Sequence, residues 1–124
     1  MSLIPIYNSK GDAEAFLEYP YIFNRNGEWV GFITPKREVY SVLGYYVGFL
    51  TNDPRILRKR ATATLRGRVT DVSIPAAPAR LYPPAVVPLA PLMSELSGSL
   101  IDVLLDEPER LHPLDVGELR EDMQ

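Results

Sequence analysis

The chain has no cysteine and a single histidine among its 124 residues. Without cysteine it can form no disulfide bridge, no cysteine-bound zinc site and no thiol nucleophile. The histidine, His112, lies between a leucine and a proline, and no partner stands at the spacing of a catalytic triad, so we interpret it as structural. Nucleotide-binding, zinc-protease and nucleophile-elbow motifs are also missing. These absences predict no enzymatic activity, no bound metal and no cofactor.

Long apolar runs are absent too. No stretch of the sequence approaches the roughly 18 consecutive apolar residues of a membrane-spanning helix, and the N-terminus lacks the basic and then apolar order of a signal peptide. The length corresponds to about one domain with one modest core. We therefore expect a soluble, cytoplasmic protein that does not bind membranes.

Turn-forming residues recur at a regular interval, and this interval reveals a repeat. Residues 6–17 align without gaps on residues 22–33 and again on residues 39–50. Each unit opens with a β-branched residue and an aromatic, reaches a glycine after a polar stretch, and leaves through an aromatic or aliphatic run. This order is typical of a β-hairpin. We expect the turn glycines to take a positive φ; they are Gly11, Gly27 and Gly44.

A second small residue recurs four positions after each turn glycine, at Ala15, Gly31 and Gly48, and a phenylalanine follows each of them. Glycine weakens a strand and is kept where the strand bulges or where another backbone comes close. We expect these small positions to meet around a common axis. The aromatics recur with the repeat, so we interpret them as core residues rather than as a binding face.

A fourth unit is expected one period later, near residue 56. Residues 55–69 keep the isoleucine opening but lose the glycine and phenylalanine positions. They predict a degenerate fourth unit that ends the sheet, with room for one long strand.

Proline is in excess, with 12 residues in the chain, about twice the usual share of roughly 5%. Six prolines lie between residues 73 and 91. Proline fixes φ and has no N–H group, so this stretch favours an extended polyproline II path. Its many apolar residues make a freely solvated linker improbable, so we expect it to lie along the β domain and to cover apolar surface or sheet edges.

The C-terminal part is expected to be helical. Ser97 is a good cap for a helix whose apolar residues repeat at helical spacing between residues 100 and 105, and Pro108 ends it. A second short helix is expected from Pro113. Helical spacing would place Asp102 and Asp106 on one face, which suits either a cation or a solvated surface.

These features divide the chain into three parts. We predict a repeated-hairpin β domain at residues 1–72, a proline-rich arm packed on it at residues 73–93, and a short acidic helical tail at residues 94–124. Residues 55–80 hold seven basic residues and one acidic residue, whereas residues 81–124 hold two basic and nine acidic residues. Either the parts have separate partners, or the acidic tail docks on the basic segment of its own chain or of a neighbouring copy.

The basic segment is the best candidate for a binding site, because basic groups neutralise phosphates and exposed aromatics stack on bases. Its candidate contact residues for nucleic acid or another partner are Arg55, Arg58, Lys59, Arg60, Arg66 and Arg68. An isoelectric point of about 5.1 and the acidic tail argue against nucleic acid.

The repeat units resemble a known bacterial family, the four-fold beta flower proteins. The resemblance rests on Tyr-Ile-Phe-Asn-Arg-Asn-Gly-Glu-Trp-Val-Gly-Phe-Ile at residues 21–33, on Val-Tyr-Ser-Val-Leu-Gly-Tyr-Tyr-Val-Gly-Phe-Leu at residues 39–50, and on Arg-Ile-Leu-Arg-Lys-Arg at residues 55–60. It covers roughly residues 4–70. It implies a mainly β fold of repeated hairpins around a pseudo-fourfold axis, with no assigned activity or catalytic residues. The first unit departs from the pattern, because Ala13 and Ala15 stand where the others have an aromatic and a glycine.

Two functions from different classes remain. The first is a non-enzymatic interaction or structural domain that presents its hairpins or its arm to a protein partner, including another copy of itself. Pro88-Leu-Ala-Pro91 matches the P-x-x-P pattern that SH3-like domains read, although this pattern arises by chance in any proline-rich run. The alternative is a module that binds single-stranded nucleic acid through the basic segment.

Overall fold

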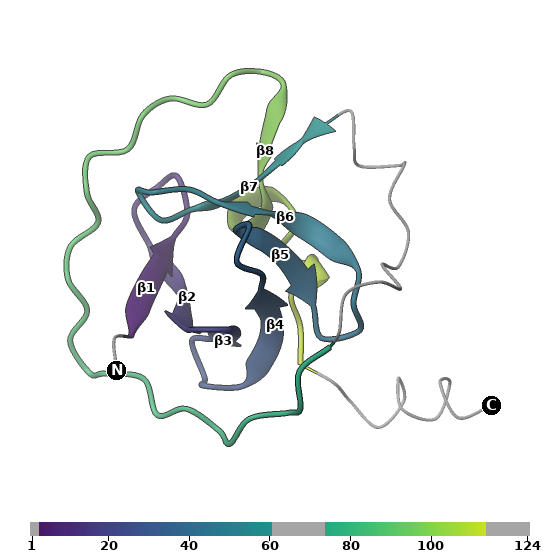
Figure 1. The fold of residues 1–124 in the computed structure, drawn as a ribbon. Coiled ribbons are helices and arrows are strands. Elements are labelled where there is room, and N and C mark those ends of the chain that lie inside the picture. Colours follow the sequence, from purple (N-terminus) through teal and green to yellow (C-terminus); the bar gives the residue numbers. More distant parts are fainter. Residues whose placement is uncertain (1–2, 61–73, 114–124) are drawn as a thin grey trace.

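The computed structural model describes residues 3–60 and 74–113, and within them the chain forms one antiparallel sheet of eight strands in sequence order (Figure 1). The strands curl round a common centre in Figure 1, so the mainly β, repeated-hairpin fold is confirmed. No helix in this part of the chain has the length and apolar character to cross a membrane. The strands are β1 Ile4–Tyr7, β2 Ala13–Glu18, β3 Tyr21–Asn24, β4 Trp29–Ile33, β5 Glu38–Ser41, β6 Tyr46–Leu50, β7 Ile56–Lys59 and β8 Leu100–Asp102.

The hairpin turns form for the reasons that the sequence suggested. In the β3–β4 turn, the Asn24 side-chain Oδ1 accepts hydrogen bonds from the backbone N–H groups of Asn26 and Glu28, both at 2.9 Å. Gly27 completes this turn at φ +82°, a region that side chains other than glycine rarely adopt. Asn8 and Ser41 accept equivalent bonds in the β1–β2 and β5–β6 turns. The glycines of these two turns also have positive φ, which confirms all three turn assignments.

Each of these three hairpins carries a bulge at the same place. The register shifts beside Tyr7, Phe23 and Tyr40, aromatic residues at or next to the end of the first strand of each hairpin. One residue of the returning strand is extra at each shift, and it is Glu14, Val30 or Val47. A bulge bends the strand and turns its side chain to a new direction. The bulges therefore give the repeated hairpins a shared curvature.

The two faces of the sheet bury different kinds of side chain. The main core cluster is aliphatic, and the β-branched residues that open the four units are all 0% exposed: Ile6, Ile22, Val39 and Ile56. Five of the recurring aromatics are also buried, namely Tyr7, Phe16, Phe23, Phe32 and Tyr40, whereas Trp29, Tyr46 and Phe49 are half-buried. They lie outside this cluster, and some contact one another, as in the stack of Phe32 on Tyr40 with ring centroids 5.5 Å apart. The prediction of buried aromatics is therefore confirmed in part, and the central core is made of smaller side chains.

The small residues within the strands allow the next hairpin to come close. A Cβ atom added to Gly31 would lie 2.5 Å from the carbonyl oxygen of Tyr40, and one added to Gly48 would lie 2.3 Å from that of Leu57. The prediction of a close backbone is confirmed. The nearest atoms belong to the next hairpin and, at Gly31, also to Leu111. The expectation that the small residues meet around a common axis stays a prediction.

The fourth hairpin is completed from a distant part of the chain. β7 supplies its first strand, and β8 pairs with β7 antiparallel through Leu57↔Asp102 and Arg58↔Ile101. The expected helix from Ser97 is therefore wrong for residues 100–102, because pairing with β7 outweighs their helical spacing. The sheet draws strands from both sides of the division predicted at residue 72.

A short helical segment follows β8 and closes one end of the core. It consists of α1 (Val103–Asp106) and the 3₁₀ turn η2 (Pro108–Arg110), and Asp102 caps α1 by accepting a hydrogen bond from the backbone N–H of Leu105. Val103, Leu104 and Leu111 join the aliphatic core. The second helix expected after Pro113 lies outside the described residues.

Candidate functional site: the arm and the hollow beside it

The proline-rich arm was predicted at residues 73–93; in the structure the segment without a strand or helix extends over residues 74–96, and the arm means these residues from here on. It runs round the outside of the sheet toward β8 (green in Figure 1). It touches the sheet at a few points. The backbone N–H of Leu81 donates to the carbonyl of Gly27 at 3.0 Å, and the hydroxyl of Tyr7 donates to the carbonyl of Pro88 at 2.7 Å. Near its end, Ser94 accepts hydrogen bonds from the guanidinium of Arg55. The arm is therefore tied to three different hairpins.

Burial along the arm follows a period of three. The half-buried residues are Pro75, Pro78, Leu81, Val87, Ala90, Met93 and Leu96. The period is broken once, because Pro83 is half-buried where the spacing of three would select residue 84. A polyproline II helix has three residues per turn, so every third side chain points the same way. One row of side chains thus faces the domain, and two rows face away from it.

One outward row is a stripe of aliphatic side chains, which we call the outer stripe: Val86, Leu89 and Leu92. Their exposed fractions are 84%, 96% and 100%. Tyr82, in the other outward row, is 85% exposed. The expectation that the arm covers apolar surface holds for its inward row only, because the arm also displays apolar surface of its own.

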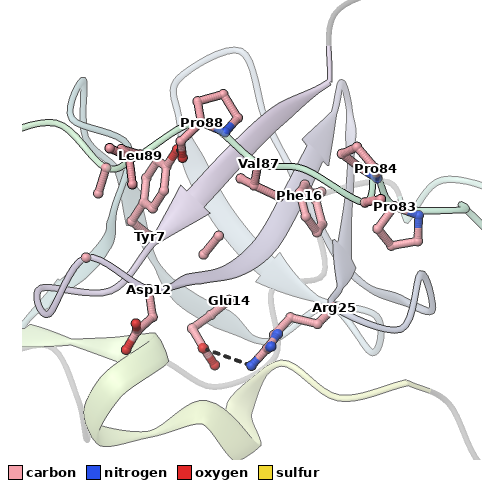
Figure 2. A pocket seen from close by; sticks show the side chains of 14 residues that line it. Tyr7, Asp12, Glu14, Phe16, Arg25, Pro83, Pro84, Val87, Pro88 and Leu89 are labelled. Carbon is pink, nitrogen blue, oxygen red and sulfur yellow. Dashed lines mark hydrogen bonds and ion pairs between the residues drawn. The ribbon is translucent and has the colours of Figure 1, made fainter.

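A hollow of about 650 Å³ lies between the arm and the first hairpin (Figure 2). The arm forms one wall with prolines and aliphatic residues, and Tyr7 and Phe16 lie beneath it. Three charged side chains gather on the opposite wall in Figure 2, namely Asp12, Glu14 and Arg25. The size falls within the roughly 300–1,000 Å³ range of ligand pockets.

The first hairpin lacks a ring that the next two hairpins have. Ala13 pairs with Tyr7 across the strands, whereas Trp29 pairs with Phe23 and Tyr46 pairs with Tyr40 in the next two hairpins. In the third hairpin the Tyr40 and Tyr46 rings pack edge to face with centroids 5.8 Å apart. An alanine provides no such ring, and Tyr7 is instead covered to 4% exposure and bonded to Pro88 of the arm.

The bulge of the first hairpin adds a carboxylate to the hollow. Val30 and Val47, the equivalent residues of the other two hairpins, are each 1% exposed and belong to the core. Glu14 takes their place, lines the hollow and keeps about a third of its side chain exposed. Its nearest cation is Arg25, with Nη1 3.6 Å from Oε1 and 70% of the side chain exposed. So long and exposed an ion pair contributes little.

The basic segment does not form a single face. Arg55 is 2% exposed and its guanidinium donates to Ser9 Oγ at 2.9 Å, to the Ser94 carbonyl at 3.1 Å and to Asp53 Oδ2 at 2.7 Å. Ser9 in turn donates to Asp102 Oδ2 through its backbone N–H and its hydroxyl. Arg55 therefore joins the arm to the first and last hairpins and is not available to a partner.

The electrostatics of Asp53 follow from this arrangement. Burial raises the pKa of the Asp53 carboxyl, but hydrogen bonds from Thr51 and Arg55, together with the charge of Arg55, bring that pKa below its ordinary value of 3.8. Asp53 is thus held in its charged form beside the guanidinium.

Arg58 is buried as well, at 2% exposure, and its Nη1 lies 2.5 Å from Glu107 Oε1 in the segment between α1 and η2. The hydrogen bond from Arg58 is the main cause that lowers the pKa of Glu107 below its ordinary value of 4.5. Lys59 and Arg60 are exposed, and Arg60 donates to the carbonyl of Gly98 at 2.8 Å.

Of the six predicted contact residues, Arg55 and Arg58 are therefore structural, and Arg66 and Arg68 lie outside the described residues. The nucleic-acid alternative rests, within the described part of the chain, on Lys59 and Arg60. The sequence signal that was missed applies to Arg58, which stands at the repeat position of Asn8, Asn24 and Ser41, two of which are buried. The repeat gives no such signal for Arg55, whose equivalents Pro5, Tyr21 and Glu38 are half-buried.

The other candidate positions are also engaged. Asp102 is 1% exposed and accepts from Ser9 and from the first turn of α1, so it does not share a helix face with Asp106. His112 has its Nδ1 3.1 Å from the carbonyl of Pro113 and lines a small hollow with Tyr45 and Arg110. Within residues 3–60 and 74–113, no group of three or more histidine, aspartate or glutamate residues could hold a metal ion.

Comparison with known proteins agrees with this architecture. The family model described as 4-fold beta flower protein matches residues 4–101, a span that includes all eight strands except the end of β8. The matched span therefore contains the arm. No curated protein and no solved structure matches the chain.

Proposed function

The chain belongs to the 4-fold beta flower family, and from that premise we propose that it is a non-enzymatic interaction domain that offers the outer stripe of its arm to a partner protein. The observation that carries this proposal is the exposure of Val86, Leu89 and Leu92 on a segment that is anchored at both ends.

Exposure of three aliphatic side chains in one row is unfavourable in water. Fully burying a valine or leucine side chain stabilises a protein or complex by about 1.5–3 kcal/mol. Three such side chains in one row leave that stabilisation unused in the isolated chain. Contiguous exposed apolar surface of this kind marks interaction sites in soluble proteins.

The anchors make the arm a suitable ligand. A partner that binds a flexible segment must order it, and each ordered side chain costs about 0.5–1.5 kcal/mol. The contacts of Leu81, Pro88 and Ser94 with the sheet already hold the backbone of the arm. The partner that suits such a segment is a protein with a shallow groove lined by aromatic residues, which reads the preformed polyproline II path.

A photocrosslinking experiment tests the proposal. A benzoylphenylalanine replaces Leu89 in cells of the source organism, and the adducts are compared with those from the same group at Lys36, an exposed residue of the β4–β5 turn. We expect a discrete adduct from the arm that a synthetic peptide of residues 81–96 removes. The double variant Val86→Ser, Leu92→Ser should abolish it.

The control is a double variant at two partly exposed isoleucines outside the stripe, Ile4→Ser with Ile74→Ser, which are 41% and 36% exposed. It should leave the adduct unchanged. If the adduct is a second copy of the chain, the partner is the protein itself. Equal adducts from residues 89 and 36, or equal loss in both double variants, would refute the proposal.

A further inference from the structure

We infer that the face beneath the arm is a recognition site for an extended proline-rich segment, and that the arm of a second copy of the chain can fill it in exchange for the chain's own arm. We call this face the docking face; it consists of Tyr7, Gly11, Phe16 and Gly27, and the arm crosses two of these residues, Tyr7 and Phe16, in Figure 2. In the structure the docking face holds the chain's own arm. The proposed function concerns an outward row of the arm, so this inference goes beyond it and does not depend on it.

The hydroxyl of Tyr7 serves the arm rather than the fold of its hairpin. Tyr7, Phe23 and Tyr40 stand at the same place in the first three hairpins and are all buried, at 4%, 2% and 2% exposure. Phe23 shows that the ring alone completes a hairpin. The hydroxyl of Tyr40 donates to Glu38 in its own hairpin at 3.2 Å. That of Tyr7 donates instead to the carbonyl of Pro88 at 2.7 Å. Carbonyls of a polyproline II segment have no partner within the segment, so a buried aromatic surface with a hydroxyl donor is suited to bind one.

Two turn glycines contact the arm at a fixed spacing. The backbone N–H of Leu81 donates to the carbonyl of Gly27 at 3.0 Å, and a Cβ atom on Gly27 would lie 1.8 Å from the carbonyl oxygen of Leu81. A Cβ atom on Gly11 would lie 3.6 Å from the Cβ atom of Ala90. Leu81 and Ala90 are nine residues apart, which is three turns of polyproline II, so both belong to the inward row. The docking face therefore recognises one row of the arm at two points.

A second copy is the favoured source of the segment, because exchange remakes every contact of the arm. A foreign segment would displace the arm and leave its inward row in water. When two copies exchange arms, each inward row is covered again on the other copy. β8 begins at Leu100, close behind the arm, so it moves with the arm and pairs with β7 of the same partner. A tethered segment has an effective concentration on the order of 1 mM, so exchange requires a protein concentration of that order.

A peptide titration followed by NMR tests recognition by the docking face. The receiver is the full ¹⁵N-labelled chain with Leu81→Ser and Val87→Ser, which weaken its own arm, and the probe is a synthetic peptide of residues 79–93. Because the arm docks in cis at an effective concentration on the order of 1 mM, the peptide should bind with a dissociation constant at or below about 1 mM. The backbone amides of Gly11 and Gly27 should shift.

Variant peptides show which row is recognised. The peptide with Leu81→Ser and Val87→Ser loses inward side chains and should bind at least about tenfold more weakly. The peptide with Val86→Ser and Leu89→Ser changes the outer stripe and should bind as well as the unchanged peptide. Equal affinities of the two variant peptides, or no shifts up to about 1 mM unchanged peptide, would overturn the inference.

Two tyrosine variants of the receiver test the hydroxyl. Tyr7→Phe should weaken binding of the unchanged peptide about fivefold, because one hydrogen bond is lost. Tyr40→Phe is the matched control and should leave binding unchanged, since the hydroxyl of Tyr40 donates to Glu38. Equal effects of the two variants would contradict recognition through Tyr7.

Joint refolding of the unchanged chain tests the second copy. Isotope-labelled and unlabelled chains are unfolded together in urea and refolded as an equal mixture at about 1 mM. We expect nuclear Overhauser effects between Leu81 of one copy and Gly27 of the other, because these residues are in contact in the docked arm. Contacts confined to the outer stripe would overturn the inference and leave the proposed function standing, and no contact between copies would overturn the inference as well. This experiment does not use the serine receiver, so it decides the inference even if that receiver does not fold.

Discussion

The substitution Arg55→Met should show how strongly the ring of hairpins depends on one buried guanidinium. Arg55 bonds to Ser9 in the first hairpin turn, to Asp53 before β7, and to Ser94 at the end of the arm. β1 and β8 do not pair with each other in the sheet, so these side-chain bonds connect the two ends of the curl. Methionine fills a similar volume and makes none of them.

The magnitude follows from the burial of the group. Removing one partner of a buried ion pair costs about 3–5 kcal/mol, because the other charge is left without compensation. The Asp53 side chain is about a quarter exposed, so water can solvate its carboxylate when the guanidinium is removed. We therefore expect the lower end of this range, about 3 kcal/mol, and for a chain of this length a melting temperature lower by roughly 10 °C.

Urea denaturation followed by circular dichroism measures this free energy of unfolding. The control is Arg60→Met, which removes an exposed arginine with a single bond to Gly98 and should cost less than about 1 kcal/mol. A double variant with Asp53→Asn should be less unstable than the sum of the single variants, because the two side chains share one interaction. The reasoning is refuted if Arg55→Met and Arg60→Met are equally stable.

The remaining predictions concern a close approach and a buried charge. Gly48→Ala should destabilise the fold by about 1–3 kcal/mol, because its Cβ would lie 2.3 Å from the carbonyl oxygen of Leu57. Gly98→Ala should change the melting temperature little, because no atom lies within 4 Å of the added Cβ. Equal changes in melting temperature for the two variants would contradict the close approach at Gly48. Because Arg58 keeps the pKa of Glu107 below its ordinary 4.5, the unfolded chain binds a proton there more readily than the folded chain, so this stabilisation is complete above pH 4.5 and is lost as the pH falls through the folded pKa. Urea midpoints measured from pH 6 to pH 3 should therefore fall less steeply for Glu107→Gln than for the unchanged chain, and identical slopes would be inconsistent with the ion pair.

The repeat could be predicted from the sequence because its signals are local. A turn glycine such as Gly27 and a capping side chain such as Asn24 act within four residues of each other, so their spacing is visible in the chain. The β-branched residue that opens each unit, as at Ile56, likewise marked all four hairpins, including the degenerate one.

The fourth hairpin could not be completed in the same way. Its second strand, Leu100–Asp102, is separated from β7 by the arm, and three residues are too few to show an alternating pattern. Ile101 and Leu104 have the spacing of a helix, but pairing of residues 100–102 with β7 satisfies their backbone groups instead. Sequence patterns report interactions between residues that are close in the chain, whereas this strand forms because it pairs with β7, which is far from it in the sequence.

The hollow beside the first hairpin could not be predicted from the sequence for a related reason. The departure of Ala13 from the repeat was visible, but its consequence depends on the arm passing beside the first hairpin. The arginines were misread because a run of basic residues is usually exposed. Arg55 lies just before β7 and Arg58 lies on it, with Ile56 and Leu57 between them, and all four residues are buried.

The most direct test of the account measures the exposure of the arm residue by residue. A soluble gadolinium chelate added to the ¹³C-labelled chain relaxes side-chain signals in proportion to their access to solvent. The account predicts a period of three along the arm, with strong relaxation at Val86, Leu89 and Leu92 and weak relaxation at Val87 and Ala90. Uniform relaxation along residues 81–96 would contradict it, because the arm would then have no inward row and no outer stripe.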